Sequence, residues 1–382
     1  MAAPGRGERA ARGVAVAVLE PLVDAAPVGS RRPPAPLARS PLAVELTTVS
    51  DDHAVVFDGM VVHEYRELSP DTDYEYDGVS FRTLPRPGGE RLSTIATVND
   101  VHFGEVRAGY IEGRPDAGPY FSVEEGEPPY PETMNRAAVE EITAVEPDLV
   151  VAKGDLTSEG LDSEYDAFLS CYKGAFGERL LHVRGNHDAY RFQSFADFGP
   201  QVQSVPGAAV ALLDTTVPGA TSGRVPAGQL EWLGDVAAPA ARDGVPVLVM
   251  GHHHVWNPAS STRPDAYFGI HPDDSEALVD VFARHASLVG YWAGHTHRNR
   301  VRRFAALTGD RPWVEVACVK DFPGAWAEYR VFEGGVLQVF HRIRRPDALR
   351  WTERTRGMFG GLYPRYAFGA LADRCFPAFL RE

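Results

Sequence analysis

The amino-acid sequence predicts an α/β protein with mixed sheets, preceded by a small β module. From Arg91 onward, short apolar runs of strand length alternate with segments that repeat their apolar residues at helical spacing. Before Pro87, apolar and polar residues alternate over short stretches, as they do in half-buried strands. Toward the C-terminal end, closely spaced strand-like runs with a turn at Glu333 indicate antiparallel pairing.

Two segments precede the α/β region. Residues 1–40 are rich in Ala, Arg and Pro and show no lasting strand or helix period, so we expect a disordered tail that cannot bury enough apolar surface to order itself. Residues 41–87 are predicted to form the short β module, and residues 85–89 a linker. The strands of the module are expected within 54–57, 61–65, 68–76 and 79–83.

Residues 91–345 are predicted to form one large α/β domain. Its expected strands and helices alternate, which favours parallel pairing. The strands are expected at 93–99, 148–153, 180–183, 208–213, 245–250, 287–293, 313–319, 327–332 and 336–341. The helices are expected at 132–146, 163–176, 227–236 and 273–285.

The charge balance of the chain excludes several classes of partner. The 382 residues include 38 Lys and Arg against 52 Asp and Glu, a formal net charge of −14, and no basic stripe offsets it. Binding to nucleic acid is therefore not expected. No run approaches the ~18 apolar residues of a membrane span, and Glu20 and Asp24 interrupt the only stretch that resembles a signal peptide. We expect a cytoplasmic protein with no membrane partner.

Residue types that bind metal ions recur where the expected strands end. In open α/β sheets, ligands bind beyond the carboxyl ends of the strands, so these turns can converge on one point. A glycine lies beside four of the five turns and permits close backbone approach. The turns are Asp100-Val-His102, Gly154-Asp155, Gly185-Asn-His-Asp188, Gly251-His-His-His254 and Gly294-His-Thr-His297.

The donor set itself indicates the ions and the reaction. Carboxylates, imidazoles and one carboxamide, without thiolates, suit Mn, Fe, Zn or Co. The donors are too many for one ion and the right number for two that share a carboxylate. Two ions about 3.5–4 Å apart hold the attacking and leaving oxygens of an in-line displacement and lower the pKa of a bound water toward about 7. We therefore expect hydrolysis of a phosphoester, with the ions supplying the local positive charge that an acidic chain lacks.

In this order and spacing, the five motifs are similar to those of the calcineurin-like metallophosphoesterase superfamily over residues 94–300. The resemblance implies a four-layer α-β-β-α sandwich of two mixed sheets flanked by helices. The two histidine-rich turns most resemble those of bacterial class III cyclic-nucleotide phosphodiesterases. The β module resembles the end of a fibronectin type III domain and the arrangement in purple acid phosphatases, but Leu156 and Thr157 stand where those enzymes carry an iron-binding tyrosine.

The resemblance also implies a role for each motif residue. The first of two divalent or mixed-valence ions would be held by Asp100, His102 and His297. The second would be held by Asn186, His252 and His295. Asp155 would bridge the ions, and a hydroxide between them would be the nucleophile. His187 would protonate the leaving oxygen or steady the phosphate, with Asp188 as its orienting partner, and His254 would lie near the substrate.

Three alternatives stay open at this level. His252 is favoured over His253 as the ligand, because in the family the ligand is the first residue after the apolar strand. The leading hypothesis is a phosphodiesterase acting on a small or cyclic nucleotide-like diester, but the same metal core serves a phosphomonoesterase. A non-catalytic scaffold of the same fold is disfavoured by the complete donor set.

The last segment, residues 346–382, is an aromatic extension. Its aromatic residues include Trp351, Phe359, Tyr363, Tyr366 and Phe368. So many large apolar side chains predict packing onto the catalytic domain, and packing onto a partner subunit, in a homodimer, is the alternative.

Overall fold

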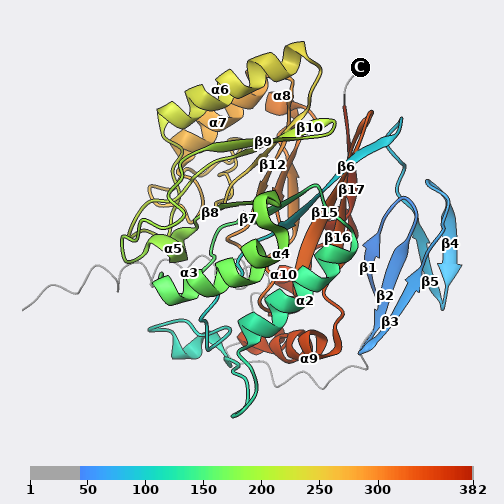
Figure 1. Cartoon of the computed structure of the whole chain (residues 1–382), viewed down its shortest axis with the longest axis vertical. Coiled ribbons are helices and arrows are strands. Elements are labelled where there is room, and N and C mark those ends of the chain that lie inside the picture. The colour runs from blue at the N-terminus through green and yellow to red at the C-terminus, as the bar shows by residue number, and fades with distance from the viewer. Residues whose placement is uncertain (1–43, 381–382) are drawn as a thin grey trace, which may run out of the picture.

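The computed structural model describes residues 44–380 and contains two six-stranded mixed sheets flanked by helices, with a small β module at the N-terminal end (Figure 1). This architecture confirms the fold class expected from the sequence. The tail predicted at residues 1–40 lies outside the described residues.

The first sheet has the strand order β17-β16-β15-β6-β7-β8. Strands β6, β7 and β8 run parallel, and β15, β16 and β17 add antiparallel pairs on one side. The carboxyl ends of the three parallel strands therefore lie at one edge of the sheet. The strands are β6 (Arg91–Val98), β7 (Leu149–Lys153), β8 (Leu180–Val183), β15 (Ala325–Phe332), β16 (Gly335–Arg342) and β17 (Phe376–Phe379).

The second sheet has the order β13-β14-β12-β11-β10-β9. Its four inner strands run parallel, and the two edge strands run antiparallel to their neighbours. The strands are β9 (Gln201–Val205), β10 (Ala208–Leu212), β11 (Val247–Met250), β12 (Leu288–Ala293), β13 (Arg300–Arg303) and β14 (Pro312–Glu315).

Strand alternation explains why the inner strands are apolar on both faces. Val151 on β7 belongs to a core cluster shared with Leu248 and Trp292 of the other sheet. Its neighbour Val150 points to the opposite face and belongs to the cluster that includes Met134 of α2. Because successive side chains of a strand point to opposite faces, each inner strand packs against a sheet on one side and helices on the other.

Helices cover the two outer faces. Helix α2 and the α3–α4 region pack on the first sheet, and α6 and α7 pack on the second. The α-helices are α2 (Tyr130–Ala144), α3 (Asp162–Phe168), α4 (Gly174–Phe176), α5 (Asn186–Ala189), α6 (Ala227–Arg242), α7 (Pro272–Arg284), α8 (Ala305–Thr308), α9 (Pro346–Thr355), α10 (Tyr363–Ala367) and α11 (Leu371–Arg374). The remaining helical turns are η1 (Pro115–Ala117), η2 (Leu169–Lys173), η3 (Gly177–Arg179) and η4 (Met358–Gly361).

The N-terminal module is a three-stranded sheet followed by a hairpin. It packs against β16, where the Thr48 hydroxyl donates to the Phe340 carbonyl at 2.6 Å. The buried guanidinium of Arg330 pairs with Asp51 at 2.7 Å and ties the module to the catalytic region. The strands are β1 (Glu45–Val49), β2 (Ala54–Asp58), β3 (Val61–Tyr65), β4 (Asp73–Tyr76) and β5 (Val79–Arg82).

Several elements differ from the sequence expectations. The strand expected at 313–319 ends at Glu315, because the chain then turns toward a cavity that Lys320 and Asp321 line. The helix expected at 163–176 is divided into α3, η2 and α4. Helix α6 continues six residues past its expected end at 236, because Ala237 still packs on the second sheet. The edge strands β9 and β17 were not expected; polar or proline-containing edge segments carry a weak strand pattern.

Candidate metal centre

The five motif turns meet at one edge of the two sheets. Asp100, Asp155 and Asn186 follow β6, β7 and β8, while His252 and His295 follow β11 and β12. Hydrogen bonds join turns from the two sheets: the backbone N–H of His295 donates to Asp100 at 3.0 Å, and His252 Nδ1 donates to the Lys153 carbonyl at 2.9 Å. Both sheets therefore contribute side chains to one centre.

The first group of possible ligands consists of Asp100, His102, Asp155 and His297, whose ligand atoms lie within 4.8 Å of one another. His297 Nε2 lies 3.3 Å from Asp100 Oδ1. His102 Nε2 lies 3.5 Å from Asp155 Oδ2. Three of the four residues are buried, and the His297 side chain is 23% exposed.

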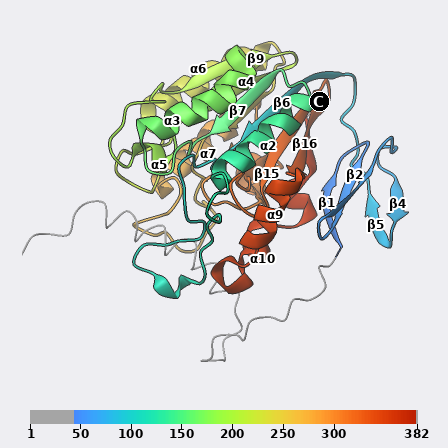
Figure 2. The same ribbon diagram turned by 60° about the horizontal axis from the view of Figure 1, so that its bottom comes forward.

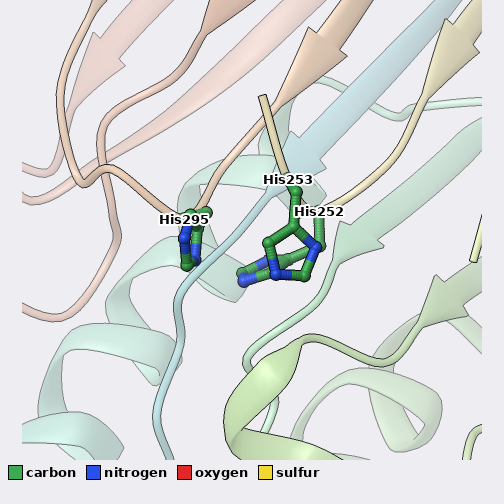
Figure 3. A group of neighbouring side chains, drawn as sticks. All are labelled: His252, His253 and His295. Carbon is green, nitrogen blue, oxygen red and sulfur yellow. The ribbon is translucent and has the colours of Figure 1, made fainter. Parts of the chain in front are cut away.

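The second group consists of His252, His253 and His295, which Figure 3 shows side by side at the ends of neighbouring strands. His252 Nε2 lies 3.0 Å from Asn186 Oδ1 and 3.3 Å from Asp155 Oδ1. Asp155 thus faces the second group with one carboxylate oxygen and the first group with the other. That is the arrangement that a carboxylate shared by two ions requires.

The ring contacts distinguish His252 from His253. A carbonyl accepts from Nδ1 of His252, so Nε2 is the ring nitrogen directed at Asn186 and Asp155. His253 uses both ring nitrogens elsewhere, Nδ1 with the Thr215 hydroxyl at 2.8 Å and Nε2 with the Thr221 carbonyl at 3.1 Å. These contacts favour His252 as the ligand of a bound ion.

Five of the possible ligands have strained backbone conformations. In residues 44–380, twelve non-glycine residues have positive φ. Such residues are uncommon and cluster at functional sites, where the surrounding structure holds them against the conformational cost. The five at this centre are Asp100 (52°), His102 (45°), Asp155 (48°), His295 (67°) and His297 (55°).

Glycine is required where the turns approach one another most closely. A Cβ atom on Gly185 would lie 2.3 Å from Asp155 Oδ1, and one on Gly154 would lie 2.6 Å from His252 Nδ1. Any larger residue would push these two side chains out of place. The glycines beside the motifs therefore set the distance between the donors.

The protonation states at the centre suit metal binding. Burial, with the nearby His187 and Lys320, lowers the pKa of His102, which favours the neutral imidazole. Burial opposes a charge on His252, but the Asp155 carboxylate outweighs it and raises the pKa of His252 to about 9. A bound cation would replace the His252 proton between these two side chains, because metal ligands must be deprotonated.

An unsatisfied histidine supports the fit of a metal ion to this centre. His102 is buried, and neither of its ring nitrogens has a hydrogen-bond partner in residues 44–380. Buried polar atoms are rarely left unpaired, and those that are call for an explanation such as an ion. The residues present therefore fit a two-ion centre in donor type, in number and in their unsatisfied atoms.

The two residues expected to act beside the metals make different contacts. His187 lines the cavity, and its Nδ1 donates to the Ser158 carbonyl at 2.6 Å. Asp188 instead accepts from Leu156, Thr157 and Gly185, and burial together with Asp155 raises its pKa to about 6. The expectation that Asp188 orients the His187 ring is corrected: a backbone carbonyl holds the ring, and Asp188 holds the turn that carries Asp155.

His254 does not take the place expected for a substrate-binding residue. It is absent from the residues that line the cavity, and its ring packs on Tyr267 with centroids 5.2 Å apart. The segment at 267–270 accounts for this difference, because Tyr267 and Phe268 lie beside the His254 ring and the Ile270 N–H donates to the His254 carbonyl at 2.8 Å.

The rest of the cavity lining consists of residues that the sequence interpretation did not assign to the site. Lys320 is buried there, with Nζ 2.6 Å from Glu105 and 3.2 Å from Asp321. The chain has only three lysines, so a lysine in a mostly apolar run was the one available signal. The other residues that line the cavity are Gly109, Tyr110, Ile111, Phe268, Thr296, Met358, Phe359, Tyr363 and Tyr366.

Comparison with known protein families supports the grouping of these motif residues in one site. A family model described as calcineurin-like phosphoesterase matches residues 93–299, just over half of the chain. The match includes every candidate ligand and ends before Lys320 and before the aromatic residues from 358 onward.

Curated relatives and a solved structure are similar to parts of the chain. A cAMP/cGMP dual specificity phosphodiesterase of Mycobacterium tuberculosis is 28% identical over 176 residues, which cover 43% of this chain and 53% of that protein. A 3′,5′-cyclic adenosine monophosphate phosphodiesterase of Pseudomonas aeruginosa is 29% identical over 175 residues, 44% of this chain and 62% of that protein. The chain thus spans less than two thirds of these relatives.

A dimetal phosphatase from Danio rerio is similar in fold, with a TM-score of 0.51 and 16% identity over 66% of this chain and 98% of that one. At this identity, the likeness concerns the fold alone. No helix within residues 44–380 is long and apolar enough to cross a membrane.

Proposed function

The chain belongs to the calcineurin-like phosphoesterase family, and on this premise we propose that it is a phosphodiesterase that hydrolyses a small or cyclic nucleotide-like diester with two metal ions. The observation that carries the proposal is the position of Asp155, whose two carboxylate oxygens face two separate groups of donors. A single-ion site would not need a carboxylate between two groups.

The proposed ligands follow from the two groups. Asp100, His102 and His297 hold the first ion. Asn186, His252 and His295 hold the second, and Asp155 is shared. When bound, the ions, of the Mn, Fe, Zn or Co class, supply Lewis acidity and neutralise the charge of the phosphate.

Backbone contacts prepare two of these histidines for binding. His252 donates Nδ1–H to the Lys153 carbonyl, and His295 donates Nε2–H to the Phe268 carbonyl at 2.8 Å. Each contact fixes the ring and leaves the other nitrogen for an ion. The strained turns keep the donors close together before any ion binds.

His187 is placed to handle the proton of the leaving oxygen. Its Nδ1 proton is committed to the Ser158 carbonyl, so Nε2 is the nitrogen that gains or loses a proton at the cavity. In the protonated form, Nε2 donates to the departing oxygen. Asp188 supports the reaction indirectly, by holding the backbone of the Asp155 turn.

Two observations favour a diester of a small organic molecule. The relatives described above are named as cyclic-nucleotide phosphodiesterases, and Ile111, Met358 and Phe359 give part of the cavity an apolar lining. The net charge of −14 disfavours a large polyanion. The cytoplasmic location and the homodimer stay predictions.

A substrate comparison tests the proposal. Protein loaded with Mn²⁺ is assayed with bis-p-nitrophenyl phosphate, p-nitrophenyl phosphate and cyclic AMP. We expect faster turnover of the diesters, and a large excess of monoester hydrolysis would overturn the diesterase assignment. A protein that binds no metal, has no activity and is unchanged in fold by Asp155→Ala would instead be a scaffold.

A further inference from the structure

The cavity has a second wall that comes from the C-terminal extension. We call residues 358–366 the C-terminal wall. Four of its side chains, those of Met358, Phe359, Tyr363 and Tyr366, line the same cavity as His102, Asp155 and His187. The family match ends at residue 299, so these residues lie beyond the part of the chain that the family model covers.

The C-terminal wall is attached directly to the candidate metal turn. The Tyr366 hydroxyl donates to the carbonyl of Thr296, the residue between His295 and His297, at 2.9 Å. The Tyr363 hydroxyl donates to Asp321 at 2.8 Å. These hydrogen bonds hold the wall at a set distance from the turn that carries His295 and His297 rather than leaving it as a loose cover.

Close packing from the other side fixes the same residues. The loop that follows β6 lies against the wall (Figure 2). A Cβ atom on Gly109 would lie 2.7 Å from Met358 Sδ, and one on Gly118 would lie 2.9 Å from Phe359 Cα. Phe359 itself has a φ of 52°, which is strained for an aromatic residue. The chain accepts this strain where Met358 and Phe359 enter the cavity.

The chemistry of the two sides of the cavity is complementary to two parts of an ester. The candidate metal ligands line one part of the cavity and Ile111, Met358 and Phe359 line another, while the Phe268 ring stacks on His295 with centroids 4.0 Å apart. Thioether and aromatic groups bind flat, polarisable rings well. A phosphate on the polar side would therefore direct its organic substituent toward the apolar side.

We propose that the C-terminal wall recognises a planar aromatic group of the ester, such as a nucleobase, and that Met358 and Phe359 are specificity-determining residues. This inference rests on the proposed function, because the phosphate must bind at the metal centre. Tyr110, which is 44% exposed, forms the rim of the same side, and the Arg107 guanidinium lies 3.6 Å from its ring centroid. The rim thus continues the aromatic surface outward.

Binding measurements on Mn²⁺-loaded protein test the inference without requiring turnover. The probes are inorganic phosphate, which reports the metal side alone, and adenosine 5′-monophosphate, which reports both sides. We expect Met358→Ala and Phe359→Leu each to weaken adenosine 5′-monophosphate binding by about fivefold or more. Phosphate binding should change by less than about twofold, since neither variant removes a metal ligand.

Phe376→Leu is the matched control, because Phe376 is a buried aromatic residue of the same extension and does not line the cavity. It should leave both affinities unchanged. If the two probes weaken equally in the wall variants, or if neither weakens, the inference is overturned. If the parent protein binds no phosphate, the proposed function fails and the inference with it; if phosphate binds and the nucleotide binds no more tightly, only the inference fails.

Discussion

The two sides of the cavity differ in charge, in backbone strain and in the segments that form them. The metal side consists of short turns at the ends of five strands, with polar donors that, except for His297, are almost completely buried. The rest of the lining, which we call the opposite side, combines the loop after β6, residues 320–321 and the C-terminal wall. Most of its side chains are aromatic or aliphatic, and its charged residues Glu105, Lys320 and Asp321 pair with one another. Strain is concentrated on the metal side, where five residues have positive φ, against Phe359 alone on the other.

Under the two proposals above, this difference separates the residues of the reaction from those that recognise the substrate. Donors that share ions must keep their positions within a fraction of an ångström, and strained turns between glycines hold them there. Apolar contacts tolerate more change in shape, so a wall made of them can vary with the substrate. Variants on the metal side should therefore affect the rate and ion content, and variants on the other side should affect affinity.

The largest effect should come from the carboxylate shared by the two donor groups. We expect Asp155→Asn to lower kcat/KM by about 10⁴-fold or more, equivalent to about 5 kcal/mol, because both ions lose a ligand. Metal content by elemental analysis should fall below two ions per chain. Asp148→Asn is the control. Asp148 lies just before β7, at the end away from Asp155, and its carboxylate accepts a hydrogen bond from the Thr94 N–H, so this variant should retain both ions. Full activity in Asp155→Asn would refute the two-ion centre.

A smaller effect should distinguish the adjacent histidines. His252→Ala should remove one ion and lower kcat/KM by about 10³-fold, since Nε2 of His252 faces Asp155 and Asn186. His253→Ala should keep two ions and lose about tenfold in rate or less, because its ring contacts Thr215 and Thr221 instead. The reverse order of metal loss would assign the ligand to His253.

Acid pH should lower the free energy of unfolding through buried groups in the sheet as well as through the metal side. His182 on β8 is the group in the sheet with which this can be tested. Burial lowers the pKa of His182 to about 4, from its usual 6.5. The unfolded chain therefore binds a proton at His182 at a higher pH than the folded chain does. The contribution of His182 to the free energy of unfolding is complete above pH 6.5 and is lost as the pH falls toward 4.

The expected loss of unfolding free energy from His182 is up to about 3 kcal/mol. Urea unfolding of metal-free protein at pH 7.5 and 4.5 measures it, by comparison with His182→Gln, which can keep the hydrogen bond to Tyr165. The variant should lose less stability than the parent over this range. Equal losses in both proteins would show that His182 titrates normally.

The smallest effect should come from a single hydrogen bond of the C-terminal wall. Tyr366→Phe removes the bond to Thr296 and should raise KM a few-fold with little change in kcat, an effect of about 1 kcal/mol. Tyr74→Phe, which removes a tyrosine hydrogen bond in the β module, is the control and should leave KM unchanged. A fall in kcat with no change in KM would show instead that Tyr366 contributes to the reaction rather than to substrate binding.

Much of the metal side could be predicted because its information is local. Each donor stands within a few residues of a strand end, and the carboxyl ends of neighbouring parallel strands meet at one edge. The order of Asp100, Asp155 and His295 along the chain therefore sufficed to predict that they gather. The choice between His252 and His253 as the ligand required the folded structure. It depends on contacts with Thr215 and Thr221, which only folding brings beside His253.

The opposite side could not be predicted, since its residues have no motif in common. Lys320 pairs with Glu105 across more than 200 positions of sequence, and Tyr366 reaches Thr296 from a segment beyond the family match. His254 was assigned to the substrate by its proximity in sequence, yet its ring packs against Tyr267.

By itself, the sequence determined the α/β class, the family and the set of donors, because hydrophobic periodicity and strand-end motifs act over short stretches of chain. The tertiary structure decided which ring nitrogens face the candidate metal centre, which backbone carbonyl holds His187 and which further side chains line the cavity. Those features arise from contacts between distant segments, and packing selects among many arrangements that the same local pattern permits.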